Sequence, residues 1–431
     1  MNGDDTVRIG ILGCGNVGSA LVRLIIDQAD VIEGRTGVHL EIARVAVRNL
    51  SRERDVPLPA SVFTHDAAEV VDDPTIDVVV EVIGGIEPAR ELIMDALKAG
   101  KPVVTANKEL LANVGREIFE TAEFAGVDLL FEAAVAGGIP FIRPLRESLV
   151  GERIRRVLGI VNGTTNFILT RMSEDGSSFH DALGEAQSLG YAERDPTADV
   201  EGFDAAAKTA IIASIAFGAR VVAGDVYREG ISELTAHDMQ SARQLGYVVK
   251  LLAIAEEIDG SIAVRVHPAM VPTQHPLASV RDSFNALFLE GDAVGELMFY
   301  GRGAGGGPTA SAVLGDLIDA AKNLASGSRG ATIGTLARKP IMPIDEVESM
   351  FYVMVEAADQ PGVLATIANV FGENRVSIRS MQQSGLGDDA RLTFVTHRAR
   401  EADLRRTVHQ VRELEAVRRI GTVLRVIGDG A

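Results

Sequence analysis

The first third of the chain alternates short apolar runs with segments whose apolar residues recur at helical spacing. Residues 7–13 (VRIGILG) form an apolar run that ends in glycine, and residues 16–30 (NVGSALVRLIIDQAD) follow with helical spacing. Similar apolar runs lie at 41–49, 77–85, 101–107 and 128–134, with helix-like segments at 88–100 and 108–126. Continuously apolar strands are typical of a parallel sheet covered on both faces, so we predict a Rossmann-type α/β domain over residues 1–139.

The rest of the chain shows two further patterns. Apolar runs at 153–170, 262–271 and 286–292 predict strands separated by long helical stretches, which indicates an α+β domain over residues 140–335. Two prolines and weak periodicity near 335–349 predict a linker. Residues 350–431 follow the order strand, helix, strand, strand, helix, strand, which predicts a ferredoxin-like βαββαβ unit. The expected fold is therefore α/β with three domains.

Composition limits the classes of ligand. The 431 residues carry a net charge of −18, with a pI near 5.0, which argues against nucleic acid or an anionic membrane as the main partner. The sequence has no apolar stretch long enough to span a bilayer and no secretion-signal pattern at its amino end. The single cysteine, Cys14, excludes an intrachain disulfide framework or a multi-cysteine metal site. We therefore expect a cytoplasmic protein that acts on small molecules.

A glycine-rich turn separates the first predicted strand from the first predicted helix. Gly13, Gly15 and Gly18 form GxGxxG in the context that this motif requires. The first glycine allows the turn, the second lets the backbone approach a pyrophosphate, and the third lets the helix pack on the strand. The amino end of the helix then faces the phosphates. A dinucleotide is predicted here, although such a turn can also occur without a ligand.

The end of the second predicted strand bears on the choice of dinucleotide. Residues 47–52 (VRNLSR) have arginines, Arg48 and Arg52, where NAD-preferring proteins place an acidic residue for the ribose hydroxyl. Guanidinium groups at this position favour a 2′-phosphate. We predict a preference for NADP, with NAD use left open. The alternative is that both arginines are solvated loop residues.

Residues 191–208 (YAERDPTADVEGFDAAAK) place five carboxylates and two basic residues at the start of an apolar helix. Asp204 and Lys208 are four residues apart, so they share a helix face, and apolar residues continue that face. Desolvation and neighbouring carboxylates act on such a lysine in opposite directions, which is how a lysine becomes a general acid or base. The alternative is a structural Asp204–Lys208 ion pair. Glu193, Asp195 and Asp199 are candidates to hold a substrate ammonium group, or to cap helices.

The position of Cys14 excludes one route for oxidoreductase chemistry. Oxidation of an aldehyde to the acyl level commonly uses a cysteine that forms a thiohemiacetal, and Cys14 cannot do this if its loop holds a pyrophosphate. The remaining reactions are alcohol to carbonyl or amine to imine, with hydride transfer to a nicotinamide. A single lysine suffices for the proton in the alcohol case.

Seven segments together resemble homoserine dehydrogenase, and the resemblance covers essentially the whole chain. They are GILGCGNVGSAL, EVIGG, VVTANKELLA, FEAAVAGGIP, GIVNGTTNFIL, LGYAERDPTADVEGFDAAAK and YGRGAGGGPTASAVLGD. The carboxy-terminal unit, which opens with DQPGVLATIANVF, resembles an ACT domain, a regulatory module that binds amino acids. The amino end lacks an aspartate kinase domain, so the resemblance is to the monofunctional form. It implies interconversion of L-homoserine and L-aspartate 4-semialdehyde with NAD(P), on the route to threonine, isoleucine and methionine.

The resemblance also implies roles for individual residues. Lys208 is the expected proton donor and acceptor, and Lys108 is expected near the nicotinamide and the reacting oxygen. Expected substrate contacts are Glu193, Asp199, Asp204, Asn162 and Thr164. Expected cofactor contacts are Gly13, Gly15, Asn16, Val17, Gly18, Arg48, Thr105, Lys108, Gly190, Gly305 and Gly306. A sodium ion is expected at the Glu132 side chain and the backbone carbonyls of Val135, Gly137 and Ile139.

Domain roles and partners follow from the same resemblance. The second domain is expected to bind substrate and to dimerise, its end returning to the Rossmann domain, and the assembly is expected to be a homodimer or homotetramer. Threonine is the expected effector, held at the turn formed by Asp359, Pro361 and Gly362 in the ACT domain, although this sequence is also a good tight turn. Two alternatives remain open: another NADP-linked amino-acid dehydrogenase that releases ammonia, and a sensor that binds NADP and an amino acid without turnover.

Overall fold

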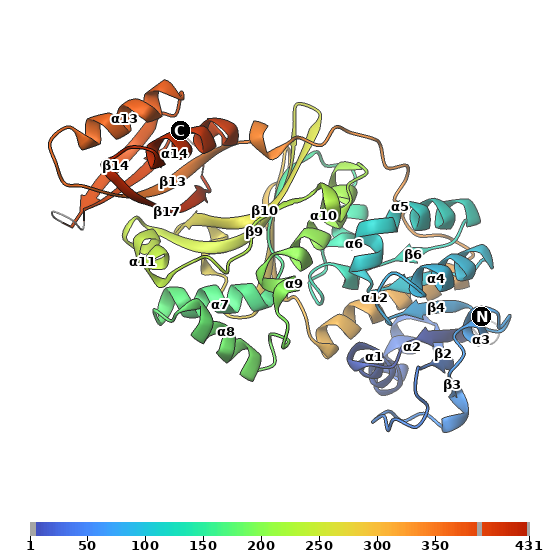
Figure 1. Cartoon of the computed structure of the whole chain (residues 1–431). Helices are drawn as coiled ribbons and strands as arrows, with labels where there is room; N and C mark the ends of the chain where they lie inside the picture. Colours follow the sequence, from blue (N-terminus) through green and yellow to red (C-terminus); the bar gives the residue numbers. More distant parts are fainter. Residues whose placement is uncertain (1–5, 386–389, 429–431) are drawn as a thin grey trace.

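Two β-sheets organise the computed structural model, which describes residues 6–385 and 390–428. Figure 1 shows the amino-terminal sheet and its helices at one end of the molecule and the carboxy-terminal unit at the other, with a middle domain between them. Among the described residues, no helix is long and apolar enough to cross a membrane.

The first sheet is six-stranded and parallel, in the order β3-β2-β1-β4-β5-β6. Its strands are β1 Thr6–Leu12, β2 His39–Ala46, β3 Phe63–Thr64, β4 Val78–Glu81, β5 Val103–Thr105 and β6 Leu129–Leu130. The surrounding helices are α1 Asn16–Asp27, α2 Ala29–Thr36, α3 Ala68–Val71, α4 Ala89–Lys98 and α5 Lys108–Ala125. The strands β1 and β4 are almost wholly buried, which confirms the predicted Rossmann-type sheet. The strand order reverses between β1 and β4, and ligands of such sheets bind outside the carboxyl ends of the strands at this point.

The middle domain supplies most of the second, eleven-stranded sheet. Its strands are β7 Ile154–Ile160, β8 Tyr227–Arg228, β9 Tyr247–Ile258, β10 Ser261–Pro272, β11 Phe284–Gly291 and β12 Gly295–Arg302. Its helices are α6 Ile142–Arg146, α7 Gly163–Glu174, α8 Phe179–Ser188, α9 Thr197–Val200, α10 Phe203–Phe217 and α11 Ala236–Gln244. Buried residues of α7 and α10 share a hydrophobic core with β9 and β10. The predicted α+β class of this domain is confirmed.

Two local predictions in the middle domain are wrong. The apolar run 153–170 is a strand only as far as Ile160, and its second half is helix α7 because Asn162 caps the helix by accepting a hydrogen bond from Thr165 N at 2.9 Å. The stretch between 171 and 261, expected to be helical, contains the strand β9. Short apolar runs do not distinguish a buried strand from a buried helix, which explains both differences.

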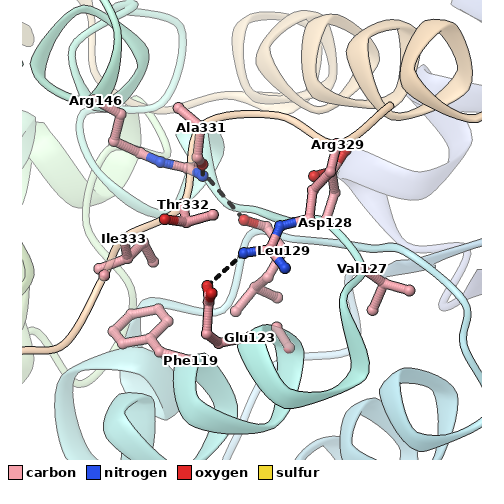
Figure 2. Close-up of a pocket in the computed structure, with 12 residues that line it drawn as sticks. Phe119, Glu123, Val127, Asp128, Leu129, Arg146, Arg329, Ala331, Thr332 and Ile333 are labelled. Carbon is pink, nitrogen blue, oxygen red and sulfur yellow. Dashed lines mark hydrogen bonds and ion pairs between the residues drawn. The ribbon is translucent and has the colours of Figure 1, made fainter. Parts of the chain in front are cut away.

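The chain returns to the first domain before it reaches the carboxy-terminal unit. Helix α12 (Gly306–Ala325) buries Val313 and Leu317 in the same core as β1 and β4, and it packs against α1. The segment that follows α12 packs against the first domain. Figure 2 shows Arg146 and Arg329 close to residues 331–333, which lead into the linker, and to 127–129 around β6. Arg329 forms an ion pair with Glu123 there at 2.5 Å.

The linker and the carboxy-terminal unit both join the second sheet. Isolated bridges connect Ala337 to Ala219 and Ile341 to Ile262. The elements that follow are η5 Ile344–Glu346, β13 Glu348–Ala357, α13 Val363–Glu373, β14 Ile378–Ser384, β15 Arg391–Thr396, β16 Ala399–Arg400, α14 Glu401–Arg412 and β17 Val417–Val426. They confirm the βαββαβ order, with β16 as a short addition. Strand β17 pairs in parallel with β10, so the two domains share one continuous sheet.

Arg425 at the end of β17 reinforces this junction. Its guanidinium, which is almost fully buried, donates to both carboxylate oxygens of Glu229 at 2.8 Å and to Glu401 at 2.6 and 3.0 Å. Glu229 belongs to the middle domain and follows β8, whereas Glu401 begins α14. The junction between the two domains is therefore a paired strand together with a buried ion cluster.

Candidate active site

Lys208 lies inside the middle domain, on the buried face of α10. Only 8% of the residue is exposed, and its Nζ donates to Asp204 Oδ2 and to Val161 O, each at 2.7 Å. The predicted shared face and the alternative ion pair are thus both present. An ammonium group carries three N–H donors, so one remains after these two bonds. A buried lysine with one remaining donor is suited to bind a reacting oxygen.

Asp204 connects two lysines from different domains. Its Oδ1 lies 3.3 Å from Nζ of Lys108, the first residue of α5 in the Rossmann domain, and its Oδ2 accepts from Lys208. Burial alone would raise the pKa of Asp204, but the charges of Lys208 and then Lys108, with hydrogen bonds from Lys208 and Asn162, lower it to about 2. Asp204 is therefore a carboxylate that holds both lysines in one place, which the separation of 108 and 204 in the sequence does not reveal.

Asn162 uses its whole side chain to hold this arrangement. Its amide donates to Asp199 Oδ1 at 2.7 Å and to Asp204 Oδ2 at 2.8 Å, while its oxygen accepts from Thr165. Burial raises the pKa of Asp199, the hydrogen bond from Asn162 opposes this rise, and the charge of Asp204 adds to it. Both amide hydrogens are engaged, so Asn162 positions the two carboxylates through direct contacts.

The other residues of the charged stretch are placed differently. The Thr164 hydroxyl donates to Tyr191 O at 2.6 Å, which fixes the turn at Gly190, a glycine with a φ of +76°. Glu193 follows this turn and is exposed. Asp195 accepts from Thr197 N at 3.1 Å and from its hydroxyl at 2.7 Å. Asp195 thus closes a turn just before α9, but the N-caps of α9 and α10 are Pro196 and Gly202, and neither helix has a side-chain cap.

The glycine turn has room for a dinucleotide at one position. A Cβ on Gly18 would lie 2.3 Å from Gly13 O, and a Cβ on Gly13 would lie 2.9 Å from Val82 O, so packing requires both glycines. A Cβ on Gly15 would meet nothing within 4 Å, and Gly15 has an ordinary φ of −86°. Neither conformation nor packing within the protein requires glycine at position 15. This fits a pyrophosphate that closely approaches the protein backbone there.

A second helix begins beside this turn. Gly305 precedes α12 with a φ of +118°, and a Cβ on Gly306 would lie 3.1 Å from Asn16 O. The amino ends of α1 and α12 therefore meet, and both offer backbone N–H groups to an anion. Val17 lies in the first turn of α1, and Arg48 is exposed two residues after β2 ends. All of these residues stand at the carboxyl edge of the first sheet.

The predicted sodium ligands surround a tight turn after β6. Glu132 is buried, and its carboxylate accepts the backbone N–H groups of Phe141, Ile142 and Arg143 at 2.5 to 2.7 Å. Two carboxylate oxygens offer about four acceptor positions, so one remains for a cation. Among the described residues there is no cluster of three or more His, Cys, Asp and Glu side chains that could hold a metal. One carboxylate and a turning backbone offer oxygen ligands of the kind that hard cations prefer.

Comparisons with known proteins agree with this arrangement. The family model for homoserine dehydrogenase matches residues 140–318. The family model for the homoserine dehydrogenase NAD-binding domain matches residues 13–132, and that for the ACT domain matches residues 351–416. The chain is 50% identical over 428 residues to the homoserine dehydrogenase of Corynebacterium glutamicum, covering 98% of this chain and 96% of that one. It belongs to the homoserine dehydrogenase family. It is therefore an oxidoreductase with an NAD(P)-binding Rossmann domain and a carboxy-terminal ACT domain.

Further relatives extend the comparison to structures. The homoserine dehydrogenase of Mycobacterium tuberculosis is 49% identical over 442 residues, covering the whole of both chains. The crystal structure of a homoserine dehydrogenase from Thiobacillus denitrificans covers 99% of each chain with a TM-score of 0.94 and 42% identity. A hyperthermophilic archaeal homoserine dehydrogenase in complex with NADPH covers 73% of this chain and 97% of that one, with a TM-score of 0.62 and 32% identity.

Two charged groups of this enzyme were missed in the sequence. Glu81 ends β4 and is fully buried. A charged residue within the apolar run 77–85 was the sequence feature that could have indicated its role. No sequence pattern indicated a role for Arg425, because its partners Glu229 and Glu401 are distant in the sequence.

In the ACT domain, the predicted effector turn has Gly362 at a φ of +92° before α13, and Asp359 Oδ1 accepts from Gln383 at 3.0 Å.

Proposed function

We propose that this enzyme catalyses the reversible reduction of L-aspartate 4-semialdehyde to L-homoserine, with NADPH as the preferred reductant. The observation that carries the proposal is the buried Nζ of Lys208, which Asp204 and Val161 O orient and which keeps one donor for a substrate oxygen. When bound, NADPH supplies the hydride. The proton for the new alcohol comes from Lys208, and in the opposite direction the neutral amine of Lys208 accepts it.

The surrounding residues bind and orient the substrate. Asp199, Asp204 and Glu193 carry the negative charge that an amino-acid ammonium group requires, and Asn162 and Thr164 keep this region in place through the bonds described above. Lys108 approaches from the Rossmann domain and brings a second positive charge near the reacting oxygen. General acid catalysis of this kind typically contributes about 10² to 10⁴ in rate.

Cofactor preference rests on two separate observations. Arg48 is exposed after β2, where a guanidinium group can bind a 2′-phosphate. The archaeal relative was determined with NADPH. The contacts proposed for the dinucleotide are Gly13, Gly15, Asn16, Val17, Gly18, Arg48, Thr105, Lys108, Gly190, Gly305 and Gly306. NAD remains an alternative substrate for the assay to measure.

A sodium ion and an effector complete the proposal. Glu132 and the carbonyls of Val135, Gly137 and Ile139 would hold sodium and so stabilise the turn between the two domains. Threonine is proposed to bind the ACT domain at the turn of Asp359, and the enzyme is proposed to work in the cytoplasm as a homodimer or homotetramer. The threonine test requires point substitutions at this turn, because removing the ACT domain would also remove β17 from its pairing with β10.

One experiment tests the central proposal. Purified enzyme is given L-homoserine with NADP or NAD, and reduced nicotinamide and released ammonium are measured with and without threonine. Reduction of NADP without ammonium release, faster than reduction of NAD, is expected. Ammonium release would identify a different amino-acid dehydrogenase, and no reduction of either dinucleotide would identify a sensor. Equal rates with both dinucleotides would refute the role assigned to Arg48.

A further inference from the structure

Glu81 is a fully buried carboxylate at the point where the strand order of the first sheet reverses. It ends β4, next to the carboxyl end of β1, and it has no exposed surface. Its Oε1 accepts the backbone N–H groups of Ile83 at 2.9 Å and Gly84 at 3.0 Å. Its Oε2 accepts the Thr105 hydroxyl at 2.6 Å. These three donors offset the cost of burying the charge, and they belong to two different segments.

The Oε1 bonds fix the segment behind the glycine turn. Val82 N donates to Leu12 O at 2.9 Å, which ties this segment to the end of β1. A Cβ on Gly13 would lie 2.9 Å from both Val82 O and a side-chain atom of Ile83. With so little space between them, a shift of residues 82–84 moves the glycine turn as well.

The Oε2 bond fixes the segment that leads to Lys108. The Thr105 hydroxyl, which donates to Glu81, accepts the N–H of Asn107 at 3.0 Å. Asn107 then caps α5 by accepting from Leu110 N at 3.1 Å, and its amide donates to Gly85 O at 2.7 Å. Lys108 is the first residue of α5, and its Nζ lies 3.3 Å from Asp204. Glu81 is thus linked to the start of α5, where Lys108 lies, through the Thr105 side chain and the backbone N–H of Asn107.

We propose that Glu81 is a positioning residue that fixes the glycine turn and Lys108 relative to each other. A carboxylate has two acceptor oxygens and no donor, which matches three convergent donors. Glutamine has nearly the same shape, but its NH₂ group would either face the two backbone N–H donors or donate to the Thr105 hydroxyl. In the second case the hydroxyl loses its carboxylate acceptor, and the charge-assisted bond is lost. This inference rests on the proposed role of Lys108 and extends it to a residue that has no exposed surface.

The first test replaces the charge and keeps the shape. Glu81→Gln is compared with Asp77→Asn, a matched control just before the other end of the same strand, where Asp77 accepts from Arg8 N at 2.8 Å. The dissociation constant of NADPH is measured by fluorescence titration and kcat by reduction of semialdehyde. For Glu81→Gln we expect kcat to fall about tenfold or more and the dissociation constant to rise severalfold, and for Asp77→Asn we expect both within about twofold. A lower melting temperature for Glu81→Gln with both values unchanged would show a purely structural role and overturn the proposal.

A double-mutant cycle tests whether the effect passes through Lys108. The fall in kcat caused by Glu81→Gln should shrink to less than about threefold when Lys108 is already alanine, since coupled residues are not additive. An equal fall in both backgrounds would refute the link, whereas an unchanged kcat in Lys108→Ala alone would refute the role of Lys108 itself. If Glu81→Gln does not fold, Thr105→Val replaces it in the cycle, because it removes only the hydroxyl between Glu81 and Asn107. It is then expected to lower kcat with Lys108 present, and this fall should shrink to less than about threefold when Lys108 is alanine; an equal fall in both backgrounds would again refute the link.

Discussion

Replacing each of two glycines of one turn by alanine should separate ligand binding from folding. In Gly15→Ala the new methyl group meets no protein atom within 4 Å, and the φ of −86° suits alanine. Gly15 is the N-cap of α1, where alanine is less favourable than glycine, but alanine also restricts the unfolded chain. These effects oppose each other, so we expect the free energy of unfolding to change by less than about 1 kcal/mol. The methyl group would nevertheless occupy the space through which a pyrophosphate approaches the backbone.

The expected loss of affinity is large enough to measure. We expect the dissociation constant of NADPH to rise at least about tenfold in Gly15→Ala, which corresponds to about 1.4 kcal/mol. Gly18→Ala is the matched comparison, because its methyl group would lie 2.3 Å from Gly13 O and force the helix away from the strand. Overpacking of this kind costs about 1–3 kcal/mol, seen as a lower melting temperature without ligand. The reasoning fails if Gly15→Ala binds NADPH as tightly as the unmodified enzyme does, or if Gly18→Ala has the same melting temperature as the unmodified enzyme.

Further substitutions test the active site and the domain junction. Lys208→Ala should lower kcat by about 10² to 10⁴ and change the NADPH dissociation constant by less than about twofold, and near-normal turnover would contradict its role. Asp204 has a folded pKa of about 2, below its unfolded value, so its stabilisation is present above pH 4 and lost as pH falls towards 2. The free energies of unfolding of the unmodified enzyme and Asp204→Asn should therefore converge between pH 4 and 2, from a difference of about 2 kcal/mol, and a constant gap would refute the assignment. Arg425→Met leaves the buried Glu401 with only the longer ion pair to Arg405, at 3.8 Å, and should cost about 3–5 kcal/mol, whereas combining it with Glu401→Gln should recover part of that loss. No recovery in a differential scanning calorimetry experiment would mean that the charge is not the cause.

Local sequence patterns were sufficient where the physics is local. The spacing of four between Asp204 and Lys208 predicts a shared helix face, and the two side chains are in contact at 2.7 Å. Likewise the GxGxxG turn follows from the conformational freedom and small size of glycine at Gly13 and Gly18. The run 153–170 shows the limit, because its apolar residues fit a strand as well as a helix, and the side-chain cap of Asn162 decides between them.

The sequence by itself determined the Rossmann and βαββαβ units, the dinucleotide turn, and the helix face that carries the lysine. Each of these depends on residues that are close together in the sequence, within one element or two consecutive elements. Only the tertiary structure brought Lys108 to Asp204, Glu81 to Thr105, and Arg425 to Glu229. These pairs are contacts between side chains from different elements, and no periodicity along the chain encodes them. They form because buried charges are stable only beside partners, and the packing of whole elements decides which partners are within reach.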